Sequence, residues 1–117
     1  MGANAVTFET VRQIALALPG VEDSTAYTMP ALKLHGDLLA SIPSNRFVEP
    51  NSLVVRVPLE DRPELLTADP AVYYVTDHYV AYDAVLVRLP QITPEALEGL
   101  LKMAHRYVST KPKSKKR

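Results

Sequence analysis

The spacing of apolar residues changes along the chain, and this change limits the fold more than any other feature of the sequence. In residues 7–18 apolar side chains recur three and four positions apart, which predicts an amphipathic helix that stops at Pro19-Gly20. In residues 30–58 they alternate with polar side chains, as in strands with one buried face. The alternation predicts a hairpin that turns at Gly36-Asp37, followed by a third strand. These strands are residues 31–35, 38–42 and 52–58.

The second half of the chain predicts the remaining elements of a two-layer domain. A short helix is expected at 59–68, strands at 71–75 and 84–89, and a last helix that is capped by Thr93. The buried stripe of that helix is Leu97, Leu100, Leu101, Ala104 and Val108. The order α-β-β-β-α-β-β-α predicts a single α+β domain over residues 1–109. Its helices would cover one side of an antiparallel sheet and leave the other side open.

Charge is distributed unevenly along the chain. There are 13 basic and 13 acidic residues, but five of the basic ones and none of the acidic ones lie in residues 110–117. Residues 1–109 therefore carry a net charge of about −5, and the tail about +5. The tail is expected to be disordered, and its cations are Lys111, Lys113, Lys115, Lys116 and Arg117. It either adds nonspecific affinity for nucleic acid or serves only as a solubilising terminus.

Composition disfavours several classes of site. The chain has no cysteine, which excludes disulfides and thiolate metal ligands, and its three histidines are too far apart for a metal-binding motif. The chain has four glycines in all and no glycine-rich phosphate-binding motif, which disfavours a nucleotide-binding loop. The longest apolar runs have five residues, against the ~20 of a membrane span, and no signal peptide is recognisable. We therefore expect a cytoplasmic, non-enzymatic protein with no metal, no cofactor and no membrane contact.

Three basic residues are expected to share the open face of the sheet. Lys33, Arg56 and Arg88 each occupy the non-core side of their own strand. Together they predict an anion-binding face for phosphates, nucleic acid or an acidic peptide. The alternative is a solvated surface on which neighbouring carboxylates neutralise them. Arg46, next to Phe47 in a loop, is a further candidate for a phosphate contact, although this phenylalanine can equally cover the core.

The loop at residues 76–83 holds the densest group of polar and aromatic side chains. His78, Tyr79 and Tyr82 lie there between two aspartates. Histidine, tyrosine and aspartate are the residue types that form general acid and base pairs, and they also line ligand pockets. The alternative is structural, because aspartates also cap turns and tyrosines also cover sheet edges. A deep pocket lined by these three residues and a carboxylate would favour ligand binding, and a flat surface would disfavour it.

Several stretches of the chain resemble the MmcQ/YjbR family of small bacterial proteins. They cover most of residues 6–109, and the most telling are Leu18-Pro19-Gly20-Val21-Glu22 and His78-Tyr79, where many members have Trp after the His. The other stretches are Thr7-Phe8-Glu9, Leu53-Val54-Val55-Arg56-Val57, Leu65-Leu66, Ala68-Asp69-Pro70 and Ala84-Val85-Leu86-Val87-Arg88-Leu89. The resemblance implies an α-β(3)-α-β(2)-α domain like that of type III secretion chaperones. Members are often described as DNA-binding, whereas the likeness to secretion chaperones is one of fold and transfers no function.

The sequence leaves three functions open. The first is DNA binding through the open sheet face and the basic tail. The second is recognition of a protein partner, a peptide or a second copy of the chain through the same face. The third is binding of a small molecule around His78. The acidic character of residues 1–109 counts against the first, because nucleic-acid-binding domains are usually basic.

Overall fold

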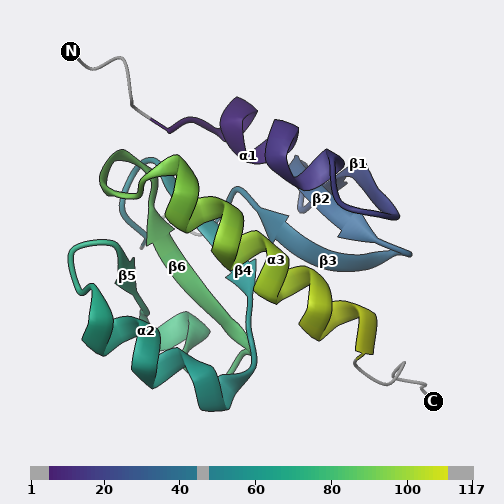
Figure 1. The fold of residues 1–117 in the computed structure, drawn as a ribbon. Helices are drawn as coiled ribbons and strands as arrows, with labels where there is room; N and C mark the ends of the chain where they lie inside the picture. Colours follow the sequence, from purple (N-terminus) through teal and green to yellow (C-terminus); the bar gives the residue numbers. More distant parts are fainter. Residues whose placement is uncertain (1–5, 45–47, 111–117) are drawn as a thin grey trace.

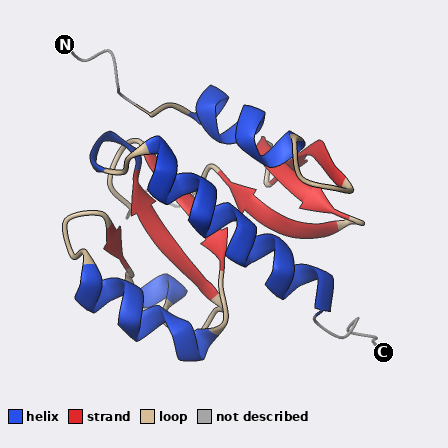
Figure 2. Ribbon diagram, in the orientation of Figure 1, coloured by secondary structure: helices blue, strands red, loops and turns tan. Residues whose placement is uncertain are grey.

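The computed structural model describes residues 6–44 and 48–110, in which helices and one sheet form two layers (Figure 1). The helices are α1 (Phe8–Leu16), α2 (Arg62–Ala68) and α3 (Pro94–Thr110), and short 3-10 helices are η1 (Leu59–Asp61), η2 (Asp77–Tyr79) and η3 (Leu89–Gln91). The strands are β1 (Val21–Ala26), β2 (Met29–Leu34), β3 (Asp37–Ser41), β4 (Ser52–Arg56), β5 (Tyr73–Tyr74) and β6 (Ala84–Arg88). Their order in the sheet is β1-β2-β3-β4-β6-β5, with antiparallel neighbours throughout. In Figure 2, α1 and α3 lie across one face of this sheet and α2 lies beside β5.

The α+β class and the antiparallel sheet are confirmed, and the structure adds one strand to the expected order. This strand, β1, pairs with β2 from Val21 opposite Leu34 to Ala26 opposite Met29. Within β1 only Val21 is buried. The sequence does not predict β1, because an edge strand is held mainly by hydrogen bonds to its neighbour and β1 shows no alternation of apolar and polar residues.

The hairpin of β2 and β3 turns one residue earlier than the sequence predicts. Leu34 pairs with Asp37, so the turn consists of His35 and Gly36, whose φ angles are 52° and 86°. Two residues in the left-handed region form the turn that best matches the twist of a hairpin. The predicted turn Gly36-Asp37 is therefore wrong by one residue, because His35 takes the first left-handed position and Asp37 already pairs with Leu34 in the ladder.

The main hydrophobic core lies between the helices and the inner face of the sheet. The predicted stripe of α3 is confirmed, since all five of its residues are buried. The N-cap is confirmed as well, because Oγ1 of Thr93 accepts a hydrogen bond from the backbone N–H of Ala96 at 3.1 Å. The sheet contributes alternate residues of its central strands, namely Leu53, Val55, Val85 and Val87. Leu65 and Leu66 of α2 pack against the same core.

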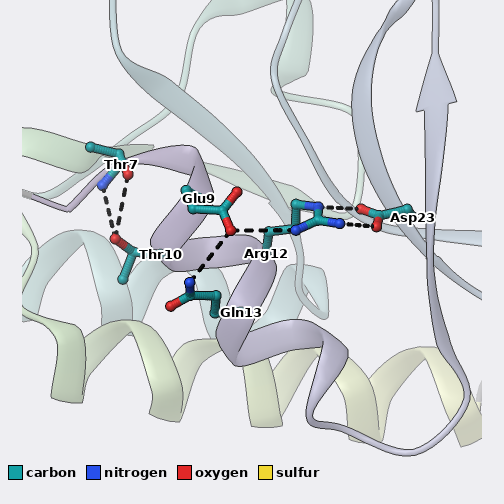
Figure 3. A network of polar contacts seen from close by, with 6 residues as sticks. All are labelled: Thr7, Glu9, Thr10, Arg12, Gln13 and Asp23. Atoms are coloured by element: carbon teal, nitrogen blue, oxygen red, sulfur yellow. Dashed lines mark hydrogen bonds and ion pairs between the residues drawn. The ribbon is translucent and has the colours of Figure 1, made fainter.

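A bidentate ion pair joins α1 to the edge strand β1 (Figure 3). Nε and Nη2 of Arg12 donate to Oδ1 and Oδ2 of Asp23 at 2.8 and 2.6 Å. The hydrogen bonds to Asp23, and then its charge, raise the pKa of Arg12 above its ordinary value. Asp23 thus faces the helical layer, and its neighbour Glu22 faces the other side of the sheet.

Gly20 marks a tight approach of the chain after α1. Its φ is 79°, and a Cβ at this position would lie 2.9 Å from Cδ1 of Leu34 and 3.1 Å from Cε1 of His35. We expect Gly20→Ala to lower the free energy of unfolding by about 1–2 kcal/mol. Gly99 in α3 leaves open space for a Cβ, so Gly99→Ala is expected to raise that free energy by up to ~1 kcal/mol. Urea unfolding of both variants measures the contrast, and effects of the same sign would contradict it.

Candidate functional site

The outer face is the side of the sheet opposite α1 and α3. The register places Lys33, Arg56 and Arg88 on this face, as the alternation predicts, together with Ser41, Val54, Ala84 and Leu86. The face is less open than expected. Val54, Ala84 and Leu86 form a second small apolar cluster, which Val48, Tyr74 and Tyr79 partly cover. The segments before β4 and before β6 therefore fold over part of the outer face.

Arg88 is neutralised by a carboxylate that is distant in sequence. Its Nε and Nη2 donate to Oε1 and Oε2 of Glu49 at 2.8 and 2.7 Å. The guanidinium also lies 4.3 Å from the ring centre of Tyr74, which suits a cation–π contact. The hydrogen bond from Arg88 lowers the pKa of Glu49, and the same bond raises the pKa of Arg88.

Arg56 is held in the same way at the far end of β4. Its Nη2 donates to Oδ2 of Asp83 at 2.7 Å, and its Nη1 donates to the carbonyl of Leu38 at 3.3 Å. The hydroxyl of Tyr107, on α3, donates to the same Oδ2 at 2.6 Å. Burial alone would raise the pKa of Asp83, but the hydrogen bonds from Tyr107 and Arg56 outweigh it and lower that pKa.

The third predicted cation also faces an acidic residue. Lys33 lies directly opposite Glu22 across the ladder of β1 and β2, on the outer face. The three basic side chains therefore share one face, but each has a carboxylate beside it or opposite it. Of the two interpretations that the sequence allowed, the neutralised surface fits this geometry better than a free anion-binding patch.

A groove of about 600 Å³ opens over the outer face. It runs between the turn that joins β1 to β2 and the loop that precedes β6. Its lining comes from four parts of the chain: Ala26 and Tyr27; Leu38, Ser41, Ile42, Pro43 and Ser44; Val54 and Arg56; His78, Tyr79, Tyr82, Asp83 and Ala84. Most of these side chains are apolar or aromatic, with a few polar groups among them, which is the usual make-up of a ligand site. We call this the outer-face groove.

The sequence candidates His78, Tyr79 and Tyr82 meet at one wall of the outer-face groove. The ring of His78 lies 4.9 Å from that of Tyr79 and 5.9 Å from that of Tyr82, measured between centroids. The two tyrosine rings are 6.1 Å apart in an edge-on arrangement. Burial raises the pKa of Tyr79, and Asp83 lies at the end of the same wall. The structure thus assembles the histidine, both tyrosines and a carboxylate around one hollow, whereas their role in binding stays a prediction.

Arg62 holds this wall in place from the first turn of α2. Its side chain is buried, at 9% exposure, and the described residues give it no carboxylate partner. Instead Nη1 donates to the carbonyls of Tyr82 and Ala84 at 2.9 and 3.0 Å, and Nη2 donates to that of Val80 at 2.7 Å. A longer bond of 3.3 Å joins Nη1 to the carbonyl of Tyr79. One guanidinium therefore organises the backbone of the loop that carries the aromatic wall.

The opposite rim of the groove is a strained hairpin turn. Tyr27 and Thr28 join β1 to β2 with φ angles of 54° and 68°. Neither residue favours the left-handed region, and a β-branched threonine is a genuine outlier there. Each such residue costs on the order of 1 kcal/mol or more. The turn leaves the Tyr27 side chain 85% exposed at the edge of the groove.

Some predicted sites lie outside the described residues. Arg46 falls in the gap between residues 44 and 48, and the tail cations Lys111, Lys113, Lys115, Lys116 and Arg117 follow the last described residue. In the described ranges, no group of three His, Cys, Asp or Glu side chains is placed to hold a metal ion. None of the described helices is long and apolar enough to span a bilayer.

Two residues that shape the groove, Arg62 and Tyr27, were not predicted from the sequence. Arg62 stands three and four positions before Leu65 and Leu66, so it belongs to the inward stripe of α2, and an arginine in such a stripe is the signal that could have identified it. Tyr27 could not be predicted, because it lies in the turn that follows β1 and β1 itself was not predicted. Asp83 was predicted either as a carboxylate beside His78 or as a turn residue, and its bonds to Arg56 and Tyr107 depend on the tertiary structure.

Comparison with known proteins supports the fold. No family model matches the chain, and no curated protein matches it. A crystal structure of the Deinococcus radiodurans protein DR2400, a DUF419 domain, is similar with a TM-score of 0.74 and 20% sequence identity, over 98% of this chain and 87% of that chain. DUF419 is a YjbR/MmcQ-like family. At this level of identity the likeness shows that the two chains share a fold.

Proposed function

We propose that this chain is a non-enzymatic binding protein whose ligand site is the outer-face groove. The observation that carries the proposal is the hollow of about 600 Å³ lined by His78, Tyr79, Tyr82 and Asp83. Its volume and mixed apolar and polar lining suit a ligand site. The proposal also places the chain among the bacterial, cytoplasmic proteins of the YjbR/MmcQ type. The matching sequence stretches and the shared fold with a DUF419 domain support that placement.

Titration with indole, a neutral aromatic probe, tests the groove by NMR. We expect chemical-shift changes in the full-length chain to gather at the groove lining. Ala26→Gln narrows the groove and should weaken the affinity at least tenfold. Ser24→Gln is the matched control, because Ser24 lies on the same face of the same strand outside the groove. The proposal would be contradicted if the two variants lost indole affinity equally, or if the chemical-shift changes clustered away from the groove lining.

DNA binding stays a second prediction, which the charge of residues 110–117 favours. The ion pairs of Arg56 and Arg88 leave less support for a route through the sheet face. We expect full-length protein to bind duplex DNA with an affinity that falls steeply with salt, and a chain ending at residue 109 to lose that binding. Fluorescence anisotropy at two salt concentrations measures both. Binding that survives the truncation would show that the tail is not the contact.

A further inference from the structure

We propose that the outer-face groove receives a segment of another polypeptide, which inserts a large apolar side chain and carries Lys or Arg beside it. This inference rests on the groove being the ligand site, as proposed above. The proposed ligand is a polypeptide rather than a small molecule, and its segment is basic rather than acidic. Separate properties of the chain support these two features.

Exposed apolar surface around the groove favours a polypeptide. Val80 and Tyr82 are 55% and 54% exposed beside the hollow, and Tyr27 is 85% exposed on its other side. A small molecule inside the hollow would contact Tyr27 and Tyr82 only on their inner sides and would leave Val80, which lies outside the lining, in water. A segment that fills the hollow and crosses its rim would bury them, and tyrosines are enriched where protein partners meet. Three of the five large hydrophobic side chains that are exposed in the described ranges are these rim residues.

The backbone conformation of the hairpin turn at Tyr27 and Thr28 is a second indication that this rim binds a ligand. Tyr27 and Thr28 are held in left-handed conformations that a glycine or an asparagine would adopt at lower cost. The strained turn projects a tyrosine beside the groove. Strain of this kind gathers at ligand clamps, where the surrounding structure maintains it.

The polar groups of the lining suit a neutral backbone. Arg56 and Asp83 already neutralise one another, while Ser44 and His78 remain exposed along the groove. A hydroxyl and an imidazole offer both donors and acceptors, as a peptide backbone requires. A ligand carboxylate would have to compete with Asp83 for Arg56, which is the only arginine or lysine among the described residues of the lining.

Charge decides between the possible polypeptides. Residues 1–109 carry a net charge of about −5, so they repel an acidic segment and attract a basic one. Residues 1–109 of a second copy would bring the same negative charge to the interface. The tail of this chain is basic, but residues 111–117 have no large apolar side chain to insert. A basic segment with an apolar residue from another protein fits both requirements.

Selection from a phage library of random dodecapeptides, panned on the full-length protein, tests the inference. We expect the enriched peptides to share one large apolar residue with neighbouring Lys or Arg. Synthetic copies should lose at least tenfold in affinity against Ala26→Gln and against Tyr82→Ser, but not against the control Ser24→Gln. Fluorescence anisotropy measures these affinities, and added salt should weaken them.

Several outcomes would overturn the inference. Enrichment of acidic peptides would contradict the proposed basic segment. Peptides whose affinity is the same for the wild type and the two groove variants would contradict the groove as their binding site. Indole binding in the groove without any peptide binding would overturn the polypeptide ligand and leave the proposed function standing, whereas failure of both probes would overturn both. A dimer in light scattering that Tyr82→Ser dissociates would assign the surface to a second copy instead.

Discussion

Replacing Arg62 with methionine is expected to lower the free energy of unfolding by about 3–5 kcal/mol. The guanidinium is buried and donates to the carbonyls of Val80, Tyr82 and Ala84 within 3.0 Å. Methionine fills a similar volume but donates no hydrogen bond, so the part-buried carbonyls of Val80 and Tyr82 and the buried carbonyl of Ala84 would lose their partner. Guanidinium chloride unfolding measures the loss, which is a large share of the ~5–15 kcal/mol that a domain of this kind has.

Two further variants separate the hydrogen bonds from the loss of an arginine as such. Arg106→Met removes an exposed arginine from the surface of α3 and should change the free energy of unfolding by less than ~0.5 kcal/mol. Arg62→Lys keeps the charge, but one ammonium cannot donate to all of these carbonyls. The free energy of unfolding of Arg62→Lys should therefore lie between those of the wild type and Arg62→Met. The carbonyl contacts would contribute little if Arg62→Met changed the free energy of unfolding only slightly, or if Arg62→Lys retained the wild-type value.

Asp83→Asn is expected to cost about 2 kcal/mol at neutral pH. The carboxylate is half-buried, and it accepts charge-assisted hydrogen bonds from Arg56 at 2.7 Å and from Tyr107 at 2.6 Å. An amide keeps one weaker acceptor and leaves the guanidinium of Arg56 without a charge partner. The loss should be measured by urea unfolding, with Asp77→Asn as the control, because Asp77 is exposed in the same loop.

The cost of Asp83→Asn should depend on pH in a definite direction. The pKa of Asp83 is lower in the folded chain than in the unfolded one. Its contribution is therefore complete above the unfolded value, about 3.9, and disappears as pH falls through the lower folded value. The wild type and Asp83→Asn should differ most at neutral pH and converge below about pH 4. A difference that stays constant down to pH 2.5 would contradict this assignment.

The sequence predicted local features of the fold well. The five buried residues of α3 and its Thr93 cap were correct, because helical periodicity and capping depend on residues a few positions apart. The strand β1 was missed, because an edge strand with one buried residue carries no such local pattern. The hairpin turn at His35 was displaced by one residue for a related reason, since a positive φ at a histidine is imposed by the pairing of β2 with β3.

The candidate site could be predicted only in part. The group of His78, Tyr79 and Tyr82 was recognisable because its members are adjacent in sequence. The hollow that they line also needs the hairpin turn at Tyr27, which comes from a distant part of the chain. Arg62 lies 17 to 22 residues before the carbonyls that it binds, and backbone carbonyls leave no signature in a sequence.

The amino-acid sequence alone determined which side of the sheet Lys33, Arg56 and Arg88 occupy, because side chains alternate along a strand whatever its neighbours are. Only the tertiary structure decided what those cations face. Glu49 reaches Arg88 across 39 residues, and Asp83 reaches Arg56 across 27. Such encounters depend on the order of the strands and the path of the loops, which local periodicity does not encode. The same paths place carboxylates beside Arg56 and Arg88 and open a largely apolar groove on the same face.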